Sequence, residues 1–273
     1  MQRIAIQGQF GSFHHTVTDR WLDTYELVPC DTFHDVFEAV AAGTADQAVV
    51  AIENSLYGSI TDVYDLLIKY KYPIVGELVE HIHLQLMAKS GVPLHDITEV
   101  YSHPVALNQC REWLEKHLPD AEIIEHHDTA GAVAYVKELD SPYSAAIAGT
   151  QASTVYDLPI LESDIEDEKT NLTRFVVINP KQTQSVVDAD KASLVITTTH
   201  HSGALYEALG IFAEDNVNLT KVQSRPIRGK SFEYQFFIDV DIDSSILDKV
   251  THSLLRLGCR VTLLGHYKSY IRS

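Results

Sequence analysis

The sequence predicts an α/β protein in two parts, and three observations support this prediction. Short apolar runs alternate with segments of helical periodicity as far as about residue 179, which favours a largely parallel sheet covered on both faces. From about residue 192 the predicted order changes to strand, helix, strand, strand, helix, strand. A polar stretch at residues 180–191 separates the two patterns and predicts a linker.

The elements of the first part follow a repeated order of strand, loop and helix. Predicted strands lie at residues 4–6, 48–52, 72–76, 84–87, 100–102 and 144–148, and predicted helices lie at 12–22, after Ser59, and at 104–117 and 130–137. Ser59, Ser102 and Asp128 precede helices, where such side chains cap the first turn, bind a ligand, or do both. Ligands of open α/β sheets bind beyond the carboxyl ends of the strands. We therefore expect the site at these connections.

The second part shows a different arrangement. Predicted strands lie at residues 193–199, 217–224, 232–241 and 260–265, and predicted helices lie at 203–213 and 245–257. This order is the ferredoxin-like βαββαβ arrangement.

Thr173 and Arg174 stand where a charged approach at residues 166–169 meets an apolar, β-branched strand at 176–178. An arginine at this position offers a planar fork suited to a carboxylate, and a threonine hydroxyl can donate a proton or a hydrogen bond. The pattern therefore indicates chemistry held by a scaffold. The alternative is an edge strand in which Arg174 pairs with a neighbouring acid.

Composition restricts the class of partner. The formal net charge of -17 argues against nucleic acid, whose binding proteins need a basic face. An anionic ligand would need local positive potential from helix N-termini and Arg174. No apolar stretch approaches the ~20 residues that span a bilayer, and the N-terminus is not signal-like, so we expect a cytoplasmic protein with no membrane partner. Cys30, Cys110 and Cys259 are widely separated and are expected to be reduced.

Fourteen histidines raise the question of a metal site. Adjacent pairs such as His14 and His15 cannot place both rings on one face of a helix or strand, and the sequence has no His-Glu-x-x-His motif. His81 and His83 could share a strand face, but the sequence shows no third ligand near them. We therefore expect no metal. The glycine motifs of dinucleotide and phosphate sites and the Gly-x-Ser-x-Gly elbow are also missing from the sequence.

Four separated motifs give the chain a family resemblance. They are residues 53–60 (ENSLYGSI), 102–110 (SHPVALNQC), 171–178 (NLTRFVVI) and 223–226 (QSRP). In this order they resemble prephenate dehydratase with a C-terminal ACT regulatory domain, over essentially the whole chain. The resemblance implies two α/β lobes around a cleft, similar to periplasmic binding proteins. It places a catalytic region at 1–179, with lobe one at about 1–79 and 153–179 and lobe two at about 80–152, a linker at 180–191 and a ferredoxin-like ACT domain at 192–273.

The same resemblance implies a lyase that converts prephenate to phenylpyruvate in phenylalanine biosynthesis, with loss of water and carbon dioxide. Aromatisation drives this reaction, so no cofactor is expected. Thr173 matches the family's proposed proton donor and Arg174 its carboxylate partner or site organiser, while Glu53 is a rival acid. The residues that would bind or position prephenate are Asn54, Ser55, Ser102, Thr129, Asn171 and Phe175.

Two other functions stay open at this point. The substrate could be arogenate, or the cleft could sense an amino acid without turnover, because two-lobed folds also serve as receptors. The first loop differs from the commoner family pattern: Gln9 and Phe10 replace a proline and a polar residue, and His14 replaces a serine.

Feedback inhibition by phenylalanine is implied by the second part. The residues expected to bind L-phenylalanine are Gly203, Ala204, Leu205, Asn218, Leu219, Gln223, Ser224, Arg225 and Pro226. Gln223 replaces a glutamate of the commoner pattern. The ligand would lie between paired ACT domains, so a homodimer or homotetramer is expected. Alternatively, Gly203 only begins a helix and the domain only dimerises.

Overall fold

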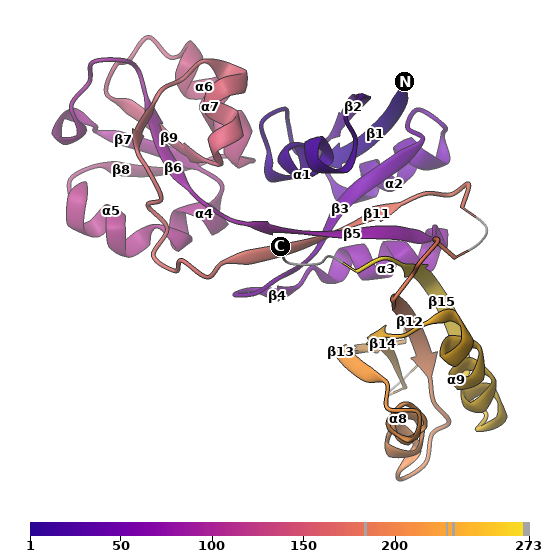
Figure 1. Ribbon diagram of the computed structural model, residues 1–273. Helices are drawn as coiled ribbons and strands as arrows, with labels where there is room; N and C mark the ends of the chain where they lie inside the picture. The colour runs from indigo at the N-terminus through magenta and orange to yellow at the C-terminus, as the bar shows by residue number, and fades with distance from the viewer. Residues whose placement is uncertain (183–184, 228, 231–232, 270–273) are drawn as a thin grey trace. The chain divides into compact units, whose positions relative to one another are not determined.

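The computed structural model describes residues 1–182, 185–227, 229–230 and 233–269 and contains two compact units. The first unit comprises Met1–Tyr64 and Val79–Phe175, and the second comprises Asp65–Leu78 and the chain from Val176 onward. Three sheets and the helices packed on them make up these units (Figure 1). In the part of the chain that the structure describes, no helix is both long and apolar enough to cross a membrane.

The first sheet has the strand order β2-β1-β3-β11-β5, and β4 pairs with β3. Its strands are β1 (Gln2–Gln7), β2 (Tyr25–Cys30), β3 (Gln47–Asn54), β4 (Gly58–Ser59), β5 (Ile74–His81) and β11 (Leu172–Ile178), and its helices are α1 (Phe13–Trp21), α2 (Phe33–Ala41) and α3 (Thr61–Tyr70). Strand β1 runs parallel to both β2 and β3. Helix α1 begins at the predicted Ser12, whose side chain accepts the backbone N–H of His15 at 3.4 Å. Ser59, expected before α3, pairs with Glu53 in β4.

The second sheet has the order β10-β6-β9-β7-β8. Its strands are β6 (Gln85–Ala88), β7 (Glu99–Ser102), β8 (Glu122–Glu125), β9 (Ser144–Ala148) and β10 (Ile160–Glu162), and its helices are α4 (Pro104–Gln109), α5 (Arg111–His117), α6 (Thr129–Glu138), α7 (Thr150–Tyr156) and the short 3-10 helix Leu94–Asp96. Strand β7 is parallel to β8 and β9, whereas β6 is antiparallel to β9 and β10. The prediction of a largely parallel sheet therefore holds only for part of each sheet.

Both faces of the second sheet are buried, as the sequence pattern predicts. Leu86 and Ile147 point into one apolar cluster, and the neighbouring Met87 and Ala146 point into another. This division follows from the two-residue period of a strand. Helices α4 and α5 cover one face and α6 and α7 the other (Figure 1).

The structure differs from two predicted features of this region. The helix expected at 104–117 is broken at Cys110, which has φ -113° and ψ 13° and separates α4 from α5. Residues 160–162 form β10 beside β6, so the chain leaves the second sheet only after Glu162. The predicted domain boundaries place the passage from lobe two back to lobe one at Ser153.

The third sheet is antiparallel, with the order β13-β14-β12-β15. Its elements are β12 (Lys191–Thr197), α8 (Ala204–Glu214), β13 (Asn218–Pro226), β14 (Tyr234–Asp241), α9 (Ser244–Arg256) and β15 (Arg260–Tyr267). The predicted βαββαβ order is confirmed, and both helices pack on the same apolar cluster of this sheet. Phe232, the predicted first residue of the third strand, lies outside the described residues.

A buried ion pair joins β5 to β12 within the second compact unit. Lys191 Nζ lies 2.9 Å and 2.8 Å from the two carboxylate oxygens of Glu77, and the side chains are only 10% and 4% exposed. Removing one partner of such a pair leaves a charge in a medium that solvates it poorly.

We predict that Lys191→Ala lowers the free energy of unfolding by about 3–5 kcal/mol, because Glu77 is left buried without its cation. Urea unfolding measures the change. The matched control is Lys230→Ala, which breaks a surface pair with Glu233 at 2.6 Å and is expected to cost less than about 1 kcal/mol. The double variant Glu77→Leu/Lys191→Met should regain most of the loss. Equal effects of the two lysine changes would contradict this account.

Candidate active site

A cavity of about 380 Å³ lies in the first compact unit, beside the carboxyl ends of β1 and β3. Its wall comes from α1 and its preceding loop, from the ends of β3 and β11, and from the segments that begin α4 and α6. Of the residues predicted to act on or bind the substrate, Asn54, Thr129, Thr173 and Phe175 line it. Glu53, Ser55, Ser102, Asn171 and Arg174 do not.

Strand geometry explains this division. Thr173 and Phe175 lie two residues apart on β11 and face the cavity, whereas Arg174 between them belongs to the other face. Glu53 and Asn54 divide in the same way at the end of β3. Arg174 Nε lies 3.3 Å from Glu53 Oε2, and the arginine side chain is only 12% exposed. The predicted acid and the predicted cation are thus paired with each other.

The Asn54 side chain holds the polar centre of the site together. Its Oδ1 accepts the backbone N–H groups of Leu56 and Tyr57 at 2.9 Å and 3.0 Å. Its Nδ2 donates to Asn171 Oδ1 at 2.7 Å and to Thr173 Oγ1 at 2.9 Å. All four hydrogen-bonding positions of the amide are therefore used, and this pattern fixes which atom is oxygen and which is nitrogen.

Thr173 is held as a hydrogen-bond acceptor with its own proton left over. Its side chain is 8% exposed, and Oγ1 receives the Asn54 N–H. Because the described residues supply no acceptor for this hydroxyl, its proton is available to a molecule in the cavity. A donor aimed at Oγ1 also stabilises negative charge that develops there.

Ser55 and Asn171 connect the two strands that carry the site. Ser55 Oγ accepts the backbone N–H of Leu172 at 2.9 Å, and Ser55 N–H donates to Leu172 O at 2.8 Å. Asn171 is buried and accepts from Asn54, while its Nδ2 has no partner within the described chain. This residue lines a second, polar pocket of about 240 Å³. Both residues lie outside the main cavity and act on its geometry.

The connections before α4 and α6 differ in detail from the sequence prediction. Ser102 is fully buried and donates to Ile147 O at 2.6 Å, so it ties β7 to β9 and does not cap α4. His103 is the N-cap instead. Asp128 caps α6 as predicted, accepting the Gly131 N–H at 2.7 Å, and Thr129 is the first residue of that helix.

The cavity wall carries little formal positive charge. Neither lysine nor arginine occurs among the described residues that line it. Burial lowers the pKa of His103, although nearby Asp128 opposes the shift. The N–H groups at the starts of α1 and α6 remain as sources of positive potential. Arg174, the other expected source, acts from the opposite face of β11.

His14 lines the cavity, although the sequence pattern marks it only as a replacement of the commoner serine. It lies in α1, and its Nε2 accepts the backbone N–H of Ala51 at 3.1 Å. Its ring packs edge-on against Phe175 at 5.0 Å. Burial lowers the pKa of His14 to about 3, so the ring is neutral at physiological pH. The signal that could have found it is its place in the first turn of the helix that follows a strand.

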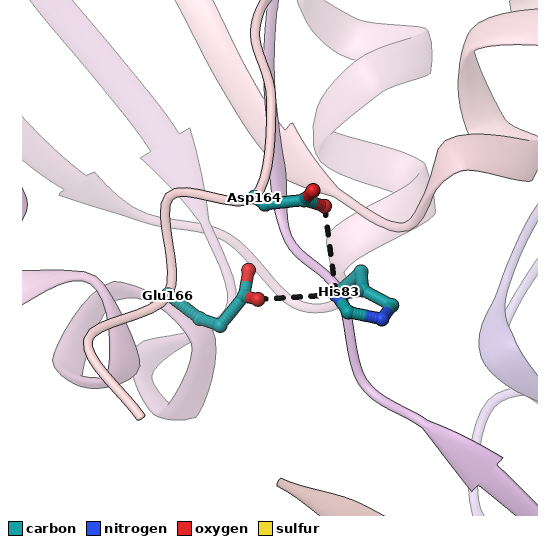
Figure 2. Close-up of side chains that lie close together, drawn as sticks. All are labelled: His83, Asp164 and Glu166. Atoms are coloured by element: carbon teal, nitrogen blue, oxygen red, sulfur yellow. Dashed lines mark hydrogen bonds and ion pairs between the residues drawn. The ribbon is translucent and has the colours of Figure 1, made fainter. Parts of the chain in front are cut away.

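One group of side chains in the described chain has the spacing of metal ligands, and it includes a histidine for which the sequence showed no third ligand. Figure 2 shows His83 pointing at Asp164 and Glu166. His83 Nδ1 lies 3.5 Å from Asp164 Oδ1 and 3.1 Å from Glu166 Oε1. Lys169 Nζ lies 3.6 Å from the same Glu166 oxygen. Lys169 supplies a cation beside Glu166, so contacts within the chain account for part of this cluster.

The residues expected to bind phenylalanine do not form one site within the chain. Gly203 precedes α8 with φ 89°, a conformation that favours glycine. Ala204 and Leu205 follow it, and Gln223, Ser224, Arg225 and Pro226 end β13. Asn218 and Leu219 begin the same nine-residue strand, about 26 Å from Pro226. An amino acid could contact candidate residues at both ends of β13 only where a second copy of the chain contributes one of the ends.

The two-sheet α/β region, with a largely apolar cavity that carries a few polar groups, defines a protein that binds a small molecule at the ends of strands. Residues 4–183 match the prephenate dehydratase family, and the chain belongs to that family. The predicted membership of this family is thereby confirmed, and the three sheets described above confirm the α/β fold class.

Three similar proteins illustrate the range of the family. "Arogenate dehydratase/prephenate dehydratase 2, chloroplastic" of Arabidopsis thaliana is 36% identical over 267 residues, which cover 93% of this chain and 68% of the relative. A prephenate dehydratase of Arthrobacter aurescens, solved in complex with L-Phe, is 32% identical with a TM-score of 0.87, covering 97% of this chain and 89% of that one. GqqA, described as a novel type of quorum quenching acylase, is 29% identical with a TM-score of 0.86 and covers 98% of each chain.

We predict that Asn54→Ala loosens the loop after β3, because the backbone N–H groups of Leu56 and Tyr57 lose their acceptor. Hydrogen exchange at these two amides should accelerate by about tenfold or more. Asn108→Ala is the matched control, since it removes a surface hydrogen bond to the hydroxyl of Tyr57 at 2.9 Å and leaves both amides paired. Unchanged exchange in Asn54→Ala would contradict the role assigned to this side chain.

Proposed function

We propose that this chain is a lyase that converts prephenate to phenylpyruvate, carbon dioxide and water. The observation that supports this most is Thr173, whose hydroxyl faces the cavity while Asn54 donates to its oxygen. Membership of the prephenate dehydratase family supplies the reaction class.

The reaction needs few groups, because aromatisation of the ring supplies the driving force. As the ring carboxylate leaves as carbon dioxide, its bonding electrons enter the ring and expel the hydroxyl group. Thr173 donates a proton to the leaving oxygen, which departs as water, and regains a proton from solution. A threonine hydroxyl is a weak acid, so the Asn54 N–H matters because it stabilises the oxygen while the proton is transferred. No cofactor takes part in this scheme.

Arg174 serves in this proposal as a site organiser. Its pairing with Glu53 joins β11 to β3 on the face opposite the cavity, beside the Asn54 hydrogen bonds. The same pairing argues against Glu53 as the acid. The cavity's uncharged donors and the starts of α1 and α6 would receive the substrate carboxylates.

The direct test is to incubate the purified protein separately with prephenate and with arogenate and to follow the aromatic product by absorbance. We expect phenylpyruvate from prephenate. Phenylalanine formed from arogenate alone would assign the arogenate alternative, and binding without product would assign the amino-acid-sensing alternative. An acylase assay run in parallel tests the activity in the description of GqqA.

We predict that Thr173→Ala lowers kcat by about 10²–10⁴ with a much smaller change in KM, because a positioned proton donor is lost. Thr173→Ser should be milder, since it keeps the hydroxyl that Asn54 contacts. Thr170→Ala, outside the cavity wall, serves as the control. An alanine variant with near-parental kcat would remove Thr173 from the mechanism.

Regulation by phenylalanine is a further part of the proposal, as is assembly into a homodimer or homotetramer. The βαββαβ unit is proposed as an ACT domain at 192–273 and would bind phenylalanine between two copies. The reason is that, within one chain, the candidate residues at the two ends of β13 lie far apart. The solved relative in complex with L-Phe supports this reading. A cytoplasmic location stays a prediction.

We predict that calorimetry on the intact protein detects phenylalanine binding and that the same concentrations reduce turnover of prephenate. Asn218→Ala should weaken both, while Asn179→Ala, outside the proposed ACT domain, should not. The intact chain is required because a chain ending near Pro180 would lack Lys191, the partner of buried Glu77. Calorimetry that shows no binding would reject the regulatory assignment.

A further inference from the structure

His14 is placed in the cavity by two contacts that leave one ring nitrogen unused. The residue is 7% exposed, and its ring is packed against Phe33 and Phe175 at 5.8 Å and 5.0 Å. The pairing of β3 with β1 ends at Val49, and His14 Nε2 accepts the N–H of Ala51 two residues further along. The ring therefore completes the hydrogen bonding of the strand that leads to Asn54.

These contacts fix the tautomer of the ring. A nitrogen that accepts a hydrogen bond carries no proton, so the proton of the neutral imidazole is on Nδ1. Burial keeps the ring neutral, with a pKa lowered to about 3. The ring cannot take up a second proton at Nε2 without losing the Ala51 hydrogen bond. It is a donor at Nδ1 and cannot become an acceptor there.

The Nδ1–H group has no hydrogen-bond partner among the residues that the structure describes. His14 lines the cavity, so a donor of this ring that no group in the described chain uses is available to an acceptor on a bound ligand. We propose that His14 is a specificity-determining residue, whose Nδ1–H donates to the keto oxygen of prephenate and selects prephenate over arogenate.

This inference rests on the proposed function and deepens it. Prephenate and arogenate differ at one position, where prephenate has a keto oxygen and arogenate has an ammonium group. A keto oxygen accepts a hydrogen bond, whereas an ammonium group presents only donors. If arogenate were bound, its ammonium group would face the Nδ1–H group of His14, and neither donor would have an acceptor. Unpaired polar groups in a buried site discriminate strongly between analogues.

Two substitutions separate this role from a structural one. His14→Gln can place Oε1 where Nε2 lies and keep the hydrogen bond from Ala51, but it has no atom at the position of Nδ1. His14→Asn can place Nδ2 at the position of Nδ1 and keep the cavity donor, but it does not reach Ala51. A residue that only supports β3 would tolerate glutamine and fail as asparagine. If His14 selects the substrate, His14→Gln should lose the preference for prephenate and His14→Asn should keep it.

The experiment measures kcat/KM for prephenate and for arogenate, together with urea unfolding, in the parental protein and both variants. We expect the parental protein to prefer prephenate. In His14→Gln the preference should fall by about tenfold, the value of one hydrogen bond, with unfolding unchanged. His14→Asn should be less stable and should keep most of the preference. His14→Ser, whose hydroxyl both donates and accepts, should also narrow the preference and serves if the glutamine variant does not fold.

Four results would overturn the inference. A parental protein that prefers arogenate would do so, as would a His14→Gln variant that keeps the parental preference. A parental protein that turns over prephenate but shows equal preference in all variants would reject the role of His14 and leave the proposed function standing. A parental protein that turns over neither substrate would reject both.

Discussion

The Asn54 amide is the interaction on which the arrangement of the site depends. It joins the end of β3, the loop that follows and the start of β11 through four hydrogen bonds, of which two hold the loop and two hold Asn171 and Thr173. Each bond has a modest net value of about 1 kcal/mol. Their combined effect is geometric, because an amide with all four positions used cannot turn. The Thr173 oxygen thereby accepts a hydrogen bond from Asn54, and the proton of its hydroxyl stays available to a molecule in the cavity.

The same centre lies next to the segments by which the chain passes between its first two sheets. Residue Ile82 on the outward passage donates its N–H to Asn171 O at 2.9 Å, and Ile165 on the return donates to Leu84 O at 2.8 Å. Glu166 adds a hydrogen bond from the Leu84 N–H and the pair with His83. The two passages are therefore bonded to each other. Asn171 belongs both to this connection and to the Asn54 network, so a displacement of one passage reaches Thr173 through Asn171 and Asn54.

Much of this arrangement could be predicted from sequence because it depends on local patterns. The strand that ends at Asn54, the cap at Asp128 and the βαββαβ order all follow from periodicity and from residues near one another in the chain. The facing of Arg174 away from Thr173 was also available, since alternate residues of a strand lie on opposite faces. Reading the two as one functional pair overlooked that period.

Other features depend on contacts between distant residues, which a single sequence does not show. His83 and Glu166 meet across 83 positions of the chain, and Asn54 and Thr173 across 119. No glycine or proline beside Cys110 indicates the break between α4 and α5. His14 looked like one of fourteen histidines, and only the Ala51 N–H beside it gives the ring a fixed tautomer. These are properties of packing, and the sequence pattern leaves them open.

The central claim is that Asn54 acts on the reaction through the Thr173 hydroxyl. A double-mutant cycle in kcat for prephenate tests it most directly, with Asn54→Ala, Thr173→Ala and the combined variant. The account predicts strong coupling: once Thr173 is alanine, the further loss of the Asn54 side chain should slow the reaction little, because the donor no longer has its acceptor. Additive losses, with the double variant slower than Thr173→Ala by the full factor of Asn54→Ala, would contradict it.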